Sequence, residues 1–138
     1  MNRLFPLLLL LILFSCKNSD NPDVSGITVN AKIERFDQAF FALDSNHIRE
    51  GLLQLNQEFP YFLNDFTVNS LGAGPLSDTS LNSFFVCRKF LTRYLPVKDS
   101  IGMKFKNMGN VEEGLNQGFQ PIRYYFPSYK LPPKVVAF

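Results

Sequence analysis

The chain has no tryptophan, one histidine and two cysteines among its 138 residues. A zinc site needs three or four converging nitrogen, sulfur or oxygen ligands. No His-Glu-x-x-His sequence is present to supply them. The 14 Lys and Arg residues nearly balance the 12 Asp and Glu residues. Because nucleic acid is bound through clusters of Lys and Arg, this balance argues against nucleic acid, and it argues equally against a strongly acidic partner.

The chain also lacks an apolar run long enough to cross a membrane. Its longest run, residues 4–14, has eleven uncharged positions. A helix rises about 1.5 Å per residue and a bilayer core is about 30 Å thick, so this run is too short. Arg3 precedes the run and the small residue Ser15 follows it. This pattern predicts a secretory signal peptide, residues 1–15, that is removed.

The residue after this signal is Cys16. The sequence Leu-Phe-Ser-Cys at residues 13–16 resembles the lipobox of bacterial lipoproteins, although Phe14 is bulkier than the usual occupant. The resemblance implies cleavage between Ser15 and Cys16 and a diacylglyceryl group on the Cys16 sulfur, with palmitate-type chains. Two acyl chains suffice for stable anchoring. The alternatives are an ordinary secretory signal with a chance cysteine and an uncleaved interfacial anchor.

Residues 16–26 are polar, contain Pro22 and Gly26, and show no apolar period. We expect a flexible, lipidated tether that holds the folded part clear of the membrane. Such segments resemble the surface-export signals of Bacteroidetes lipoproteins. With only Asp20 and Asp23 acidic, the leaflet stays open. The predicted location is the cell envelope, lipid-anchored, at the outer membrane.

With Cys16 used for lipid, Cys87 is the only other cysteine, so no intrachain disulfide is possible. We interpret Cys87 as a small, buried apolar group. A catalytic thiol would need a base, and the only histidine, His47, stands near the start of another predicted helix. Gly72 and Gly74 are interpreted as a turn rather than a phosphate loop, because no Lys-Ser/Thr follows them.

Periodicity predicts the order of elements after the tether. Alternation over residues 27–36 predicts a strand, and residues 37–43 a short helical turn. A helix follows over residues 48–59, capped by Asp44 or Ser45 and ended by Pro60. Residues 61–77 are expected to form a loop.

The second half is predicted to contain more helix and a last strand. A helix capped by Ser77 or Asp78 ends before Pro96, and a separate short helix covers residues 100–107. A third helix begins at Asn110 with Glu113 completing a capping box. Residues 134–138 form a terminal strand. The apolar stripes are Leu81, Phe84, Phe85, Arg88, Leu91 and Leu95 in the first of these helices, and Leu115, Phe119, Ile122 and Phe126 in the third.

These elements predict an α+β fold, predominantly α-helical, with a short amino-terminal strand and a terminal strand that can pair. Residues 27–138 form one domain. The chain stops inside the apolar run 134–138, so we expect a partial domain whose edge strand invites aggregation.

Several short aromatic motifs carry a family resemblance. The sequence resembles the amino-terminal half of the gliding motility-associated lipoproteins called GldB, in Bacteroidetes, through residues 33–37 (IERFD), 41–44 (FALD), 59–62 (FPYF), 122–127 (IRYYFP) and 132–136 (PPKVV). It is also similar to a group of zinc-dependent peptidases that carry a His-Glu-x-x-His helix, a motif absent here.

The resemblance leaves two functional classes. The first is a non-catalytic, lipid-anchored envelope component that binds other proteins of the gliding machinery. The second is the amino-terminal part of a zinc-dependent metallopeptidase-like protein whose catalytic residues lie beyond Phe138. We interpret Asp37 and Asp44 as turn and cap residues rather than general bases, and Glu112 with Glu113 as helix-dipole partners rather than a dyad. The chain itself is therefore predicted to be no enzyme, with no catalytic residue, metal, cofactor or small-molecule ligand beyond the lipid on Cys16.

Overall fold

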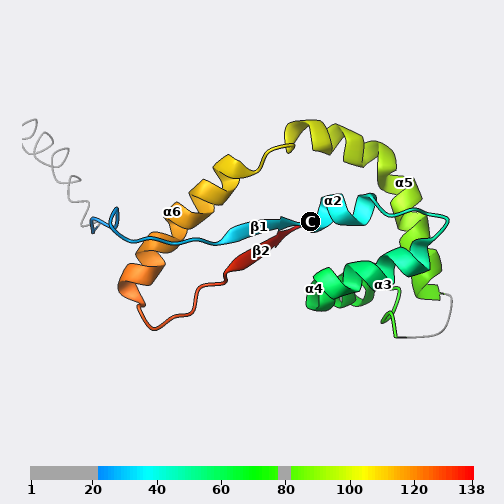
Figure 1. Ribbon diagram of the computed structural model, residues 1–138, viewed down its shortest axis with the longest axis horizontal. Coiled ribbons are helices and arrows are strands. Elements are labelled where there is room, and N and C mark those ends of the chain that lie inside the picture. Colours follow the sequence, from blue (N-terminus) through cyan, green and yellow to red (C-terminus); the bar gives the residue numbers. More distant parts are fainter. Residues whose placement is uncertain (1–21, 78–81) are drawn as a thin grey trace, which may run out of the picture.

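The computed structural model describes residues 22–77 and 82–138. The predicted signal peptide and the lipidation site at Ser15 and Cys16 lie outside these residues, as do Asp78 and Leu81. The elements are β1 (Lys32–Arg35), α2 (Phe36–Phe41), α3 (Ile48–Glu58), α4 (Pro60–Asp65), the π-helix η1 (Phe66–Ser70), α5 (Asn82–Lys104), α6 (Gly109–Tyr125) and β2 (Lys134–Ala137). Figure 1 shows this mainly helical arrangement with one strand pair, which confirms the predicted fold class.

The two strands come from opposite ends of the described chain and form a parallel pair. Their register runs from Lys32 opposite Lys134 to Arg35 opposite Ala137. All the helices after β1 lie in the connection between the strands, as a parallel pair requires a long crossover. The expected pairing of the first and last strands is confirmed, and it brings the end of β2 to the start of α2 (Figure 1).

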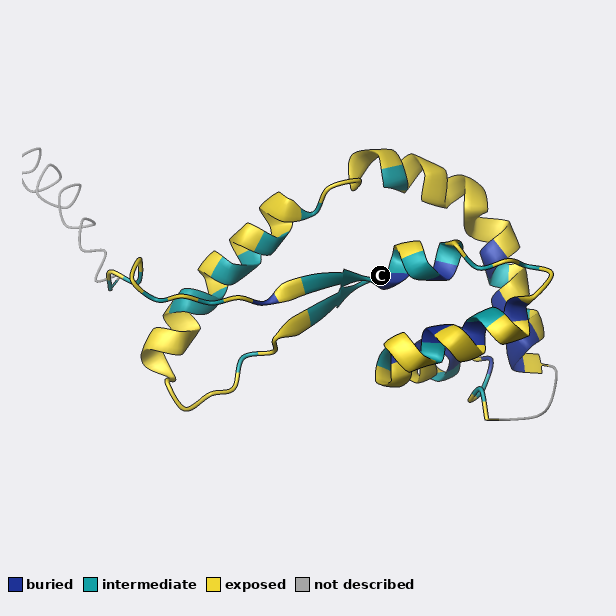
Figure 2. Ribbon diagram, in the orientation of Figure 1, coloured by how far each residue is buried: buried dark blue, intermediate teal, exposed yellow. Residues whose placement is uncertain are grey.

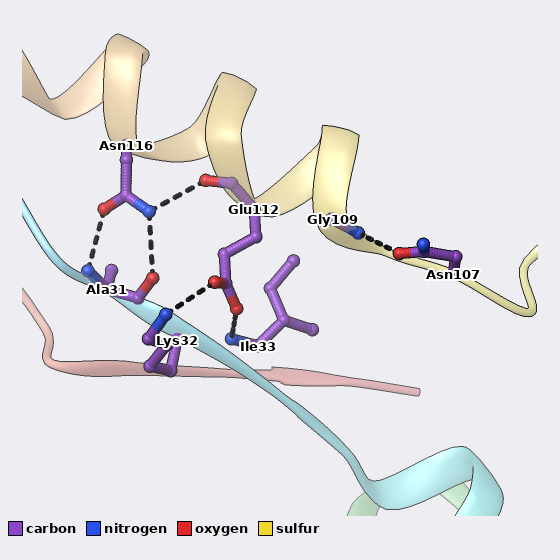
Figure 3. A network of polar contacts seen from close by, with 7 residues as sticks. All are labelled: Ala31, Lys32, Ile33, Asn107, Gly109, Glu112 and Asn116. Carbon is purple, nitrogen blue, oxygen red and sulfur yellow. Dashed lines mark hydrogen bonds and ion pairs between the residues drawn. The ribbon is translucent and has the colours of Figure 1, made fainter.

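The first strand is shorter than predicted. Residues 27–31 keep the predicted alternation, since Ile27, Val29 and Ala31 are the more buried positions, but they do not pair with another strand. Instead, Ala31 faces helix α6. Its N–H donates to Asn116 Oδ1 at 2.7 Å, and Asn116 Nδ2 donates back to the Ala31 carbonyl at 3.0 Å (Figure 3). The side-chain amide of Asn116 thus takes the place of a neighbouring strand as the hydrogen-bond partner of the Ala31 backbone.

Two more residues of α6 continue this row at four-residue spacing. The Ile33 N–H donates to Glu112 Oε2 at 2.9 Å, and Gln120 Nε2 donates to the carbonyl of Ile27 at 2.9 Å (Figure 3 shows the first bond). Lys32 Nζ also lies 2.9 Å from Glu112 Oε1. One edge of β1 is thus closed by β2 and the other by a polar face of α6.

Helix α6 has no buried residue. Of its predicted apolar stripe, Leu115 and Phe119 are half-buried, whereas Ile122 and Phe126 are exposed. The predicted capping box is wrong. The helix begins at Gly109, whose N–H donates to Asn107 Oδ1 at 2.7 Å, so Asn110 already lies inside it. The side-chain oxygen before the helix therefore comes from Asn107 and not from the predicted Asn110.

The core lies where α2, α3, α4, η1 and the first part of α5 meet (Figure 2). Phe36 is fully buried at its centre, and its ring lies 5.4 Å from that of Phe59 and 5.3 Å from that of Phe66. Edge-on aromatic packing of this kind adds to the free energy gained from burial. The core thus holds the end of β1, next to Phe36, and the first part of α5 in place relative to each other.

The expected loop over residues 61–77 is wrong in its first half. Pro60 ends α3, as predicted, but it also occupies the first turn of α4, where its missing N–H costs nothing. Leu63 and Phe66 then continue the buried face through α4 and η1. The loop begins only after Ser70. Gly72 and Gly74 both have positive φ, 62° and 88°, which confirms their role in a turn.

Two details of the predicted helix ends also need correction. Asp44 does not cap α3, because that helix begins after His47 and has no side-chain cap bond; its carboxylate accepts from the Asn46 N–H at 2.8 Å in a local turn. Ser45 makes no cap bond either.

The break predicted at Pro96 is wrong, because α5 runs without interruption from Asn82 to Lys104. The proline deprives one carbonyl, that of the exposed Thr92, of its helical donor, and water can replace it there. Figure 1 shows that α5 bends, as helices do at proline. We call residues 92–104 the distal half of α5.

The predicted face of α5 is also shifted. Phe84 and Leu91 are buried, as predicted, but Cys87 is fully buried between them, whereas Phe85 and Leu95 are 64% and 44% exposed. Arg88 is exposed as well. Cys87 is therefore a central member of the stripe, which confirms its interpretation as a small core residue.

Candidate functional site

A largely apolar groove with a volume of about 510 Å³ lies between the distal half of α5 and the corner where β1 enters α2. The end of β2 closes its third side. Its lining consists of Arg35, Asp37, Gln38, Phe41, Phe90, Tyr94, Val97, Lys98, Ile101, Gly102, Phe105, Met108, Ala137 and Phe138. The volume falls within the range of about 300–1,000 Å³ that is usual for binding sites.

One wall of the groove is a stripe on α5 and the residue after it. Tyr94, Val97, Ile101 and Phe105 follow one another at spacings of three and four, which places them on one face of the helix. Each is between 42% and 47% exposed. Every residue from 92 to 106 is exposed apart from Gly102. This stretch therefore presents large apolar side chains without burying any of them.

The opposite wall belongs to the core. Phe138 lines the groove and is 66% exposed, yet its ring centre lies 4.8 Å from that of the buried Phe66. Phe90 lies at the junction of the two walls, 5.9 Å from Phe40 and 4.6 Å from Tyr94 between ring centres. The groove is thus an extension of the aromatic core that is open to solvent.

The floor of the groove is a charged corner at Arg35 and Asp37. Arg35 Nε donates to Asp37 Oδ1 at 2.7 Å, and its Nη2 donates to Asp37 Oδ2. Its Nη1 donates to the carbonyl of Phe105 at 2.7 Å. Arg35 therefore joins the β1–α2 corner to the residue that follows α5, using the fork geometry that suits carboxylates.

This geometry also sets the ionisation of the corner. Partial burial acts to raise the pKa of Asp37, but the hydrogen bonds from Arg35 and from the backbone, with the charge of Arg35, outweigh it and leave the pKa lowered. The hydrogen bond to Asp37 raises the pKa of Arg35. Both groups are charged and paired with each other at neutral pH, which does not suit either of them to act as a general acid or base.

The other predicted chemical candidates are not brought together. Burial raises the pKa of the Cys87 thiol to about 11, so it is no nucleophile near neutral pH. The imidazole of His47 is exposed and lies 2.7 Å from Asp44 Oδ2. That contact raises the pKa of His47 and lowers that of Asp44. Cys87 and His47 thus have different partners and surroundings.

Glu112 and Glu113 also have separate roles. Glu112 bonds to β1, whereas Glu113 accepts from Gln117 Nε2 at 3.2 Å on the exposed side of α6. The bond from Ile33 and the contact with Lys32 lower the pKa of Glu112. Within residues 22–77 and 82–138, no cluster of three or more His, Cys, Asp or Glu side chains is arranged to hold a metal ion. None of the helices in those ranges is long and apolar enough to cross a membrane.

Sequence reasoning missed the groove and the polar row of α6. The signal for the row was present as Glu112, Asn116 and Gln120 at four-residue spacing, a pattern that is polar where a core-facing helix would be apolar. The signal for the groove is the recurrence of Tyr94, Val97 and Ile101 across Pro96, the residue at which the sequence predicts a helix end.

Comparison of the sequence with known protein families identifies the family of this chain. The family described as gliding motility protein GldB matches residues 17–138. The chain belongs to the GldB family. This confirms the resemblance inferred from the aromatic motifs, several of which form the core around Phe36. Membership associates the chain with gliding motility and with lipoproteins of the cell envelope. Neither a curated protein nor a solved structure matches it.

Proposed function

We propose that the protein is a lipid-anchored, non-catalytic component of the outer membrane that supports gliding by binding a partner protein in the groove beside α5. The groove carries this proposal. Val97, Ile101 and Phe138 are each at least 47% exposed, and all three line this one concave site. They are therefore gathered together and not scattered singly over the surface. Contiguous exposed apolar surface of this kind marks interaction sites.

Two further observations support the proposal. The lipobox at Cys16 offers a covalent attachment to the membrane, and family membership agrees with a lipoprotein. The charged groups of the groove floor are already paired with each other, which suits a structural corner better than acid–base chemistry. The metallopeptidase alternative places its catalytic residues beyond Phe138, and no contact among the described residues favours it.

The anchor is tested by Cys16→Ala in the native cells. The variant should stay uncleaved by the lipoprotein signal peptidase, and fractionation should find it outside the outer membrane, with gliding lost. Normal processing and normal membrane location would contradict the anchor.

The groove is tested separately by Val97→Glu, with Met103→Glu as its matched control. Val97 lines the groove, while Met103 is 80% exposed and lies outside the lining. Both variants add one negative charge to the exposed half of α5. Val97→Glu should abolish colony spreading at an unchanged protein level, and Met103→Glu should leave spreading intact. Normal spreading of Val97→Glu would contradict a role for the groove.

A further inference from the structure

The charge of α5 differs sharply from that of the chain as a whole. The helix carries five basic residues, Arg88, Lys89, Arg93, Lys98 and Lys104, and one acidic residue, Asp99. The near balance of the full sequence therefore conceals a basic helix, which weakens the argument from composition against an acidic partner.

Three of these cations flank the apolar stripe of the groove. Arg93 precedes Tyr94 by one position and Lys104 precedes Phe105 by one, so both lie on the same side of the stripe. Lys98 follows Val97 by one position and lies on the other side, where it lines the groove. Its nearest acidic oxygen is that of Asp99, at 3.6 Å.

An apolar stripe flanked on both sides by like charge, here Arg93 and Lys104 on one side and Lys98 on the other, is a pattern by which one helix selects another. Residues at a and d positions supply the contact, and flanking charges choose the partner. We propose that the groove binds an acidic amphipathic helix of another polypeptide, laid along α5 with its apolar face on Tyr94, Val97 and Ile101. Together with Phe105 the stripe runs over the twelve residues 94–105, so the contact covers about three turns. The inference rests on the proposed function and adds the chemistry of the partner.

The charges argue against the other occupants of such a groove. A second copy paired through α5 would bring two basic helices together, and like charges across an interface are unfavourable. A lipid chain with an anionic head would satisfy one cation, but Arg93 and Lys104 are eleven positions apart, about 16 Å along a helix. A row of carboxylates along a partner helix can reach cations that are this far apart.

The test uses the full lipoprotein in nanodiscs of phosphatidylcholine and a fluorescent synthetic peptide of 18 residues. The acidic probe has Leu at a and d and Glu at e and g, and a basic probe has Lys in place of Glu. Fluorescence anisotropy at low salt should show saturable binding of the acidic probe, at least about tenfold tighter than that of the basic probe, because electrostatic complementarity sets specificity. High salt should weaken the acidic probe's binding.

Three variants locate the binding. Ile101→Glu should weaken the acidic probe at least about tenfold, as expected for a central apolar contact. The double variant Lys98→Glu/Lys104→Glu should reverse the preference and favour the basic probe. Met103→Glu, which adds the same charge away from the groove lining, should change the affinity less than about twofold. Equal affinity for the two probes, or equal loss in Met103→Glu and Ile101→Glu, would overturn the proposal.

The remaining outcomes assign the groove differently and also overturn it. A dimer in sedimentation analysis that Ile101→Glu dissociates would assign the groove to a second copy. Saturable palmitate binding that Ile101→Glu abolishes, without binding of the acidic probe, would assign it to an acyl chain. If the acidic probe fails while Val97→Glu still stops gliding, only the acidic helix is refuted and the proposed function stands.

Discussion

Helix α6 and the distal half of α5 both bury almost nothing, yet they are held in different ways. Helix α6 uses polar side chains to hold β1 and the extended segment before it, where Glu112, Asn116 and Gln120 bond to the backbone. The distal half of α5 has no such row. Its large side chains face a groove, and its described attachment to β1 is the bond from Arg35 to the Phe105 carbonyl at its end.

This difference separates a helix that completes the fold from one that is available to a partner. A polar helix face can dock without burial because each bond satisfies a backbone group that would otherwise be unpaired. An apolar face contributes no hydrophobic free energy until it is covered and removed from water. The exposure of Val97 and Ile101, each 47% exposed, therefore calls for a covering element outside the described residues.

The largest expected effect distinguishes the two halves of α5. Leu91 is 3% exposed in the first half, so Leu91→Ala should lower the free energy of unfolding by about 2–5 kcal/mol through lost burial and a cavity. Ile101→Ala, in the distal half, should change it by no more than about 0.5 kcal/mol. Urea unfolding followed by circular dichroism measures both. Equal losses would mean that the distal half is as much a part of the core as the first.

The next effect tests the polar docking of α6. Asn116→Ala removes both bonds to Ala31, which is 1% exposed, and leaves a buried N–H and carbonyl without partners. The expected loss is about 2–3 kcal/mol. Hydrogen exchange at the Ala31 amide should accelerate in parallel. Gln117→Ala is the matched control, because the side chain of Gln117 bonds to Glu113 on the exposed side of the same helix. Identical midpoints for the two variants would show that the row does not hold the strand.

The spacing of apolar residues predicted those parts of the fold that depend on a single stretch of sequence. The alternation of Ile27, Val29 and Ala31 gave the buried side of the first extended segment, and the spacing of Ile48, Leu52 and Leu55 gave the buried face of α3. Pairing of the first and last strands followed because both were the only apolar, strand-like runs in a helical sequence.

Other features could not be found locally, for different physical reasons. Asn116 meets Ala31 across 85 residues, so no window of sequence contains both. Pro96 lies where the deprived carbonyl is exposed, and that tolerance depends on the position of α5 in the fold. The groove is a cavity between α5 and the corner of β1 and α2, and it exists only once Arg35 has joined them.

The smallest effect concerns that corner and the end of the distal half. Asp37→Asn leaves Arg35 without its carboxylate partner and should cost about 1 kcal/mol at pH 7, since charge-assisted bonds are strong but this pair is partly exposed. The pKa of Asp37 is lowered in the folded state. Its contribution is therefore fully present above its unfolded pKa of about 3.9 and is lost as the pH falls through the folded value. Urea unfolding between pH 7 and pH 2.5 should show the gap between wild type and variant closing toward acid. Asp99→Asn, 72% exposed on the same helix as the groove stripe, should show a difference of no more than about 0.5 kcal/mol at any pH. A gap for Asp37→Asn that stays constant over this range would mean that its charge does not secure the corner.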